Sequence, residues 1–175
     1  MKALIVGVGD CRVSDAAEDV LVTYALGSCV AVAIYDPMVR VGGILHYMLP
    51  QSEIDPVKAS QKPYMFADTG IPLLFRQAYE RGAEKRRLIV RVAGGAQVMD
   101  AEGVFNIGKR NYVAMRKIFW KAGILIQGEA VGGNTSRTMR LEIGTGRLWL
   151  REAKGLDLEM PGPALRGADQ WRSGY

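Results

Sequence analysis

Two apolar segments that flank a short polar turn, residues 30–35 and 40–48, constrain the fold more than any other part of the sequence. The β-branched residues in these segments favour strands: Val30, Val32, Ile34, Val41 and Ile44. The turn between them begins with Asp36 and Pro37, and Asp at the first and Pro at the second position are typical of a type I turn. We therefore predict a β-hairpin whose four-residue loop spans 36–39.

The position of this loop sets the register of the hairpin. If Tyr35 pairs with Arg40, then Cys29 lies directly opposite His46, the only histidine in the chain. Directly opposed residues have Cβ atoms about 4.5–5.5 Å apart, so the thiol and the imidazole would be within reach of each other. A shift of one residue would place them on opposite faces of the sheet. Three small residues also line their face, which would leave room for a substrate: Ala31, Ala33 and Gly42.

A cysteine beside a histidine is suited to nucleophilic chemistry. The thiolate is the nucleophile, and a neighbouring imidazole lowers the thiol pKa and later protonates a leaving group, as acyl transfer from an amide or ester requires. Thr23 offers a hydroxyl that could orient the imidazole, and a turn at Gly27 and Ser28 could direct backbone N–H groups toward an oxyanion. The alternative is that Cys29 is a small buried apolar residue and His46 an ordinary strand residue, and the residues alone leave both readings open.

A glycine pair, Gly94-Gly95, follows a predicted strand over 88–92. The missing side chains would let a backbone or a substrate approach closely. Neither this pair nor Gly7 and Gly9 has the spacing of a dinucleotide-binding loop, so we expect no cofactor. The chain has two cysteines and one histidine without a closely spaced ligand pair, and we therefore expect neither a structural metal nor a disulfide framework.

Several short motifs occur together and in the order that a known family shows. They are Thr23-x-x-Leu26-Gly27-Ser28-Cys29-Val30, Gly43-x-x-His46-x-x-Leu49-Pro50, Gly94-Gly95-Ala96, Ile107-Gly108 followed by Asn111, and Gly132-Gly133 followed by Arg137. Over about residues 10–152 this pattern resembles the CheD family of chemoreceptor glutamine deamidases. The Cys and His motifs together are specific, whereas each glycine pair alone would indicate little.

This resemblance implies a cysteine hydrolase that converts particular glutamines of methyl-accepting chemotaxis receptors to glutamate, with a methylesterase activity in some members. It implies that Cys29 is the nucleophile, His46 the base and Thr23 the third polar residue of the site. It also implies a β-sandwich flanked by helices, similar to the deamidating toxins of the cytotoxic necrotizing factor type, and the CheC phosphatase as a regulatory partner. The alternative to this enzymatic function is a non-enzymatic basic module that docks on an acidic protein.

Size and composition are those of one ordinary globular domain. The chain has 175 residues, of which 49% are hydrophobic, and we assign residues 1–153 to a single domain and 154–175 to a flexible tail that contains proline and glycine. No apolar run of about 18 residues occurs, and the N-terminus does not resemble a signal peptide. We therefore expect a cytoplasmic protein without membrane insertion.

The net charge of +5 is concentrated in one segment, residues 109–121, which contains no acidic residue. At about 100° per residue, its basic residues gather on one face of a helix: Lys109, Arg110, Arg116, Lys117 and Lys121. This basic face is either simply solvated or docks on an acidic surface, such as the helical bundle of a receptor. Nucleic acid is a weaker candidate, because no aromatic residues alternate with the basic ones for stacking on bases.

Together these patterns predict an α/β (α+β) fold with a sandwich-like, mixed or antiparallel sheet core of about seven to nine strands and about two main helices. We expect helices over 64–81 and 108–122, and beside the hairpin the strands 3–8, 20–24, 88–92, 124–126, 137–143 and 147–151. Residues 10–19 and 51–63 are expected to be loops, and the second of these is a candidate lid over the site.

Overall fold

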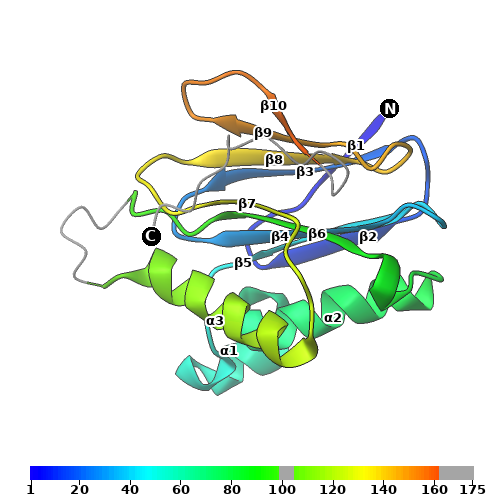
Figure 1. Ribbon diagram of the computed structural model, residues 1–175. Coiled ribbons are helices and arrows are strands. Elements are labelled where there is room, and N and C mark those ends of the chain that lie inside the picture. Colours follow the sequence, from blue (N-terminus) through cyan, green and yellow to red (C-terminus); the bar gives the residue numbers. More distant parts are fainter. Residues whose placement is uncertain (99–104, 162–175) are drawn as a thin grey trace.

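The protein has three layers: an outer sheet, a middle sheet and a layer of helices (Figure 1). The computed structural model describes residues 1–98 and 105–161. The outer sheet has the strand order β1-β3-β8-β9-β10, formed by β1 (Lys2–Ile5), β3 (Asp19–Leu26), β8 (Arg137–Glu142), β9 (Leu148–Glu152) and β10 (Leu158–Met160). The middle sheet has the order β2-β5-β4-β6-β7, formed by β2 (Asp10–Ser14), β4 (Val30–Asp36), β5 (Val41–Tyr47), β6 (Ile89–Gly94) and β7 (Gly128–Val131).

The helices lie against the face of the middle sheet that points away from the outer sheet (Figure 1). They are α1 (Pro56–Gln61), α2 (Ala67–Glu80) and α3 (Ile107–Ala122), with short 3-10 turns at Ser52–Ile54, Pro63–Met65 and Lys85–Arg87. Both main helices are amphipathic, and α3 ends at Gly123, whose φ of 66° is the left-handed conformation that commonly follows a helix. The predicted mixed α+β fold and both predicted helices are confirmed, and the likeness to the toxins stays a prediction.

Two hydrophobic cores hold the layers together, one on each face of the middle sheet. One face of β4 and β5 packs against α2 and α3 through residues that include Val32, Leu45, Leu74 and Phe119. The other face packs against the outer sheet through Ala31, Ala33, Ile44, Leu21, Met139 and Leu141. A Cβ atom on Gly42 would lie 2.7 Å from Ile143, which directly follows β8 of the outer sheet. The face of small residues therefore lets the two sheets approach each other, and the expectation that it leaves room for a substrate is wrong.

The hairpin of β4 and β5 is confirmed, but its register differs from the predicted one by two residues. Ala31, not Cys29, is opposite His46, and Asp36 pairs with Val41. Asp36 stays in the strand because its buried carboxylate binds the Arg87 guanidinium at 2.8 Å and also accepts from the Met38 N–H. The loop consequently begins one residue later than predicted. A shift of two residues preserves the alternation of faces, so His46 still points toward the outer sheet.

Three local predictions are wrong. Residues 10–14 form strand β2 on the edge of the middle sheet instead of a loop, and 51–63 is largely helical instead of extended loop. Residues 124–126 do not form a strand, because the strand that follows α3 begins at Gly128. The predicted strand over 3–8 is found in a shortened form as β1.

The outer sheet extends into the segment that the sequence analysis assigned to the tail. Strand β10 pairs antiparallel with β9, with Met160 opposite Leu148, and the Met160 side chain is fully buried. The part of the predicted tail that follows residue 161 lies outside the described residues.

Candidate active site

A hydrogen bond between the two sheets holds His46 in one orientation. His46 on β5 and Thr23 on β3 are both buried, and the Thr23 Oγ1 lies 2.8 Å from the His46 Nδ1. The Thr23 hydroxyl also lies 2.7 Å from the Val6 carbonyl oxygen, and this oxygen can only accept. Because the hydroxyl has a single proton and donates it to Val6, it accepts from the His46 Nδ1–H. The neutral imidazole therefore carries its proton on Nδ1 and its lone pair on Nε2.

The lone pair on Nε2 is available for chemistry. Among the described residues, this buried nitrogen has no hydrogen-bond partner. Burial lowers the pKa of His46 to about 4, because a protonated imidazole would lose its hydration there. At neutral pH, His46 is thus an uncharged base.

Cys29 lies in the bend at 27–29, one residue before β4, and is partly exposed. It is two residues from Ala31, the partner of His46, and is therefore a diagonal neighbour of the imidazole. Such neighbours are about 7–8 Å apart in a regular ladder, and no hydrogen bond joins the thiol to Nε2 among the described residues. The predicted direct opposition of Cys29 and His46 is wrong, but the structure places both residues at the same end of the sandwich.

The thiolate form of Cys29 is disfavoured. Burial raises the pKa of Cys29, and the nearness of its own backbone N–H to the sulfur opposes this effect only in part. The imidazole was expected to lower the thiol pKa, but burial dominates and the net shift is upward. A neutral thiol beside a neutral imidazole requires the base to accept the proton during attack.

Both glycines of the predicted pair Gly94-Gly95 contact the backbone of Cys29. The Gly95 N–H donates to the Cys29 carbonyl at 2.8 Å, and a Cβ atom on Gly94 would lie only 2.1 Å from that same oxygen. The φ of 109° at Gly94 also favours glycine. These contacts explain why residue 94 must be glycine, and they bring Gly94, Gly95 and the Cys29 bend together.

The same hydrogen bonds reduce the number of possible oxyanion donors. The N–H of Gly27 donates to the Ala25 carbonyl, and the N–H of Gly95 is already bound to Cys29. Among the described residues, no backbone hydrogen bond uses the N–H of Ser28 or of Cys29. The candidate donors are therefore Ser28 and Cys29 rather than the glycines.

One residue of the site was not recognised as functional in the sequence. Asn111 on α3 is fully buried, and its Nδ2 donates to the carbonyl of Ser28 at 3.0 Å and to that of Met48 at 2.8 Å. It shares the apolar face of α3 with Met115 and Phe119. A polar residue within an apolar helical stripe is the signal that could have identified it.

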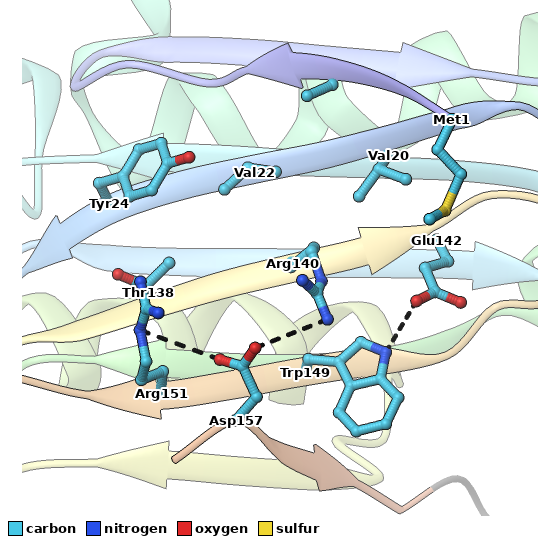
Figure 2. A pocket seen from close by; sticks show the side chains of 11 residues that line it. Met1, Val20, Val22, Tyr24, Thr138, Arg140, Glu142, Trp149, Arg151 and Asp157 are labelled. Carbon is cyan, nitrogen blue, oxygen red and sulfur yellow. Dashed lines mark hydrogen bonds and ion pairs between the residues drawn. The ribbon is translucent and has the colours of Figure 1, made fainter. Parts of the chain in front are cut away.

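A separate hollow of about 350 Å³ lies on the exposed face of the outer sheet, and Figure 2 shows its lining. Its polar groups largely bind one another: Asp157 lies 3.7 Å from Arg140 and 3.9 Å from Arg151, and the Trp149 Nε1 donates to Glu142. None of the predicted site residues lines it. The hollow is therefore a poorer candidate for chemistry than the Cys29 region.

Two further observations concern the described residues. Within residues 1–98 and 105–161, no helix is both long and apolar enough to cross a bilayer. Over the same ranges, no three side chains of the His, Cys, Asp and Glu types gather as metal ligands would.

Comparison with known proteins places the chain in a family. A family model described as CheD chemotactic sensory transduction matches residues 48–152, which is more than half of the chain. The chain belongs to the CheD family. The CheD model match begins after His46, so the N-terminal part of the site rests on individual relatives.

The similar CheD proteins are named for one activity. A protein of Solibacter usitatus (strain Ellin6076), a probable chemoreceptor glutamine deamidase CheD, is 65% identical over 152 residues, 87% of this chain and 90% of the relative. A second probable deamidase, from Syntrophus aciditrophicus (strain SB), is 56% identical over 89% of this chain and 97% of its own length. The chemoreceptor glutamine deamidase CheD of Thermotoga maritima is 38% identical over 86% of this chain and 92% of its own length. An alignment of 152 residues within a chain of 175 necessarily includes Cys29 and His46.

Proposed function

We propose that this protein hydrolyses the side-chain amide of specific glutamines in methyl-accepting chemotaxis receptors and thereby converts them to glutamates. The names of the CheD relatives support the substrate. The observation that supports the chemistry most directly is the Thr23–His46 hydrogen bond, because it leaves the lone pair of a neutral imidazole on Nε2, at the same end of the sandwich as Cys29. In this proposal Cys29 is the nucleophile, His46 the base and Thr23 the group that orients it.

The proposed reaction begins when the Cys29 sulfur attacks the carboxamide carbon of glutamine. The His46 Nε2 accepts the thiol proton as the C–S bond forms, and the carbonyl oxygen becomes an oxyanion. When this intermediate collapses, the C–N bond breaks and Nε2–H protonates the departing ammonia. A thioester of the receptor with Cys29 remains.

Water then completes the reaction. His46 Nε2 accepts a proton as the water oxygen attacks the thioester carbon, and collapse of the second intermediate breaks the C–S bond. The leaving sulfur recovers the proton from Nε2–H, and the receptor carries a glutamate. With a glutamate methyl ester as substrate, the same steps would release methanol in place of ammonia.

We further propose that the oxyanion binds to the N–H of Cys29, with Ser28 as a second donor. Both groups belong to the nucleophile bend, and neither is used in a backbone hydrogen bond among the described residues. Removal of one donor from an oxyanion site typically lowers kcat by about 10²–10³-fold, so the orientation of these groups matters for rate.

The location and regulation also belong to this proposal. We place the protein in the cytoplasm, where reducing conditions would keep Cys29 a thiol. The CheC phosphatase, which the family resemblance implied, stays a predicted partner. A non-enzymatic docking module remains the second candidate, and the exposed basic face of α3 favours it.

A single experiment separates these two functions. A receptor fragment is co-expressed with the wild-type protein, with Cys29→Ala or with His46→Ala, and its glutamines are analysed by mass spectrometry. Each deamidation adds about one mass unit, because NH₂ is replaced by OH. We expect conversion with the wild type only. Conversion by Cys29→Ala at the wild-type level would exclude the mechanism, and binding without conversion by the wild type would favour the docking module.

A further inference from the structure

Asn111 makes hydrogen bonds to the segments that carry both reactive residues. Its Nδ2 has two protons, and one goes to the carbonyl of Ser28, directly before Cys29, while the other goes to the carbonyl of Met48, two residues after His46. A carbonyl can only accept, so the side chain must present its NH₂ group here rather than its oxygen. The Asn111 Oδ1 has no partner among the described residues although it is buried. This unsatisfied acceptor is unfavourable, which indicates that the residue is kept for its two donors.

The helix that carries Asn111 is fixed at the same place. The Tyr47 hydroxyl donates to the Asn111 backbone carbonyl at 2.7 Å, which connects α3 to the end of β5. One turn earlier, a Cβ atom on Gly108 would lie 2.5 Å from the Gly95 carbonyl oxygen, so α3 packs directly on the glycine loop. The backbone that carries the Asn111 side chain is therefore held firmly in place.

The hydrogen bond from Asn111 to the Ser28 carbonyl also determines where the Cys29 N–H points. The carbonyl of Ser28 and the N–H of Cys29 belong to the same peptide bond, which is planar and trans, so the two groups point in opposite directions. When Asn111 holds the Ser28 carbonyl on the side of α3, the Cys29 N–H must point away from α3. Rotation of this peptide would break the hydrogen bond to Asn111.

We propose that Asn111 is a positioning residue that orients the Cys29 N–H as an oxyanion donor by holding the Ser28–Cys29 peptide. This inference rests on the proposed deamidase function. Asn111 does not touch the substrate, and its contribution is to keep a main-chain donor aimed before the oxyanion forms. A donor that needs no reorganisation during the reaction is the most effective kind.

The test compares two substitutions of Asn111 with one control. Asn111→Leu keeps the size of the side chain and removes both donors, and we expect kcat for a receptor fragment to fall by about 10–100-fold while KM changes by less than about threefold. Tyr112→Phe is the control, because it removes a hydrogen bond from the next residue of α3 to Glu129 on β7 and leaves the bonds to Ser28 and Met48 in place; it should keep kcat within about threefold of the wild type. Equal losses in Asn111→Leu and Tyr112→Phe, or an unchanged kcat in Asn111→Leu, would overturn the proposal.

A pH profile gives an independent readout that also serves if Asn111→Leu fails to fold. Asn111→Asp preserves the shape, but a carboxylate would face two carbonyl oxygens, whereas the protonated carboxyl can donate to one of them. We therefore expect the kcat of Asn111→Asp, relative to the wild type, to rise as the pH falls from about 8.5 to about 6. A flat ratio contradicts the proposal, because a role in packing alone does not depend on a donor.

The two proposals fail in distinguishable ways. If Cys29→Ala is inactive while Asn111→Leu and Asn111→Asp keep the wild-type kcat and pH profile, only the role of Asn111 is wrong. If Cys29→Ala remains active, the proposed cysteine mechanism is wrong, and if the wild type converts no receptor glutamine, the proposed function is wrong; in both cases the role of Asn111 is wrong with it.

Discussion

At the scale of single residues, the site combines an imidazole base whose tautomer is fixed with a cysteine whose thiol stays protonated. The Thr23 hydroxyl fixes the tautomer of His46, and burial keeps the imidazole neutral. The same burial raises the pKa of the Cys29 thiol. Proton transfer and attack must therefore occur together, once a substrate has brought the carboxamide to the sulfur.

This arrangement predicts the pH dependence of thiol alkylation. Without substrate, the rate at which iodoacetamide modifies Cys29 should keep rising through and above about pH 8.5, the usual thiol pKa, because the thiol pKa is raised. The rate is measured by mass spectrometry of the intact protein, with Cys29→Ala as the control. Cys11 should not contribute, since burial raises the pKa of its thiol to about 12. A plateau below pH 7 would instead indicate a preformed thiolate–imidazolium pair.

The sequence could identify the reactive residues but not their exact relation. Thr23, Cys29 and His46 were found from motifs and from the hairpin, whereas the register depended on whether Asp36 belongs to the loop or to the strand. Its ion pair with Arg87, far along the chain, decides this question, and local turn preferences contain no information about it. The prediction of a lowered thiol pKa was wrong for a similar reason. The burial that raises this pKa depends on the packing of both sheets.

At the scale of elements, α3 has one face that holds the site and another that is free to bind. Asn111, Met115 and Phe119 are buried, while the five basic residues predicted to share a face are exposed: Lys109, Arg110, Arg116, Lys117 and Lys121. Helical periodicity was sufficient to predict this division. Residues 10–14 show the opposite case, because the short polar strand β2 is formed only through its pairing with β5.

The basic face of α3 predicts a charge-dependent interaction with the receptor. Lys117→Glu should weaken deamidation of a receptor fragment, mainly through a higher KM, because a favourable charge contact is replaced by a repulsive one. Added salt should weaken the wild type in the same way. The control is Lys154→Glu, which makes the same charge change in the turn between β9 and β10, on the other side of the sandwich (Figure 1). Equal effects of the two substitutions would exclude a specific role for α3.

At the scale of the whole molecule, the site connects the two sheets, because Thr23 lies in the outer sheet and His46 in the middle sheet. A buried neutral histidine makes folding sensitive to acid. The unfolded chain binds a proton at a pKa of about 6.5, and the folded protein does so only at about 4. The free energy of unfolding should therefore decrease as the pH falls from about 6.5 to about 4, by up to about 3 kcal/mol, and this group should have no effect at higher pH.

Urea denaturation at pH 7.5 and pH 4.5 tests this contribution. His46→Gln keeps a polar group near Thr23 but cannot titrate, so its stability should change less between these pH values than that of the wild type. If both proteins lose the same stability, the acid sensitivity arises from other groups and the lowered pKa of His46 is wrong.

The Thr23–His46 hydrogen bond between the sheets also determines at what stage of protein synthesis the site can form. All three side chains of the site precede β8 in the chain, so they leave the ribosome before it. Strand β3, which carries Thr23, pairs in the outer sheet with β8. A nascent chain therefore holds the thiol, the imidazole and the hydroxyl before the outer sheet can close over them. Catalysis should begin only after β8 has been translated and has paired with β3.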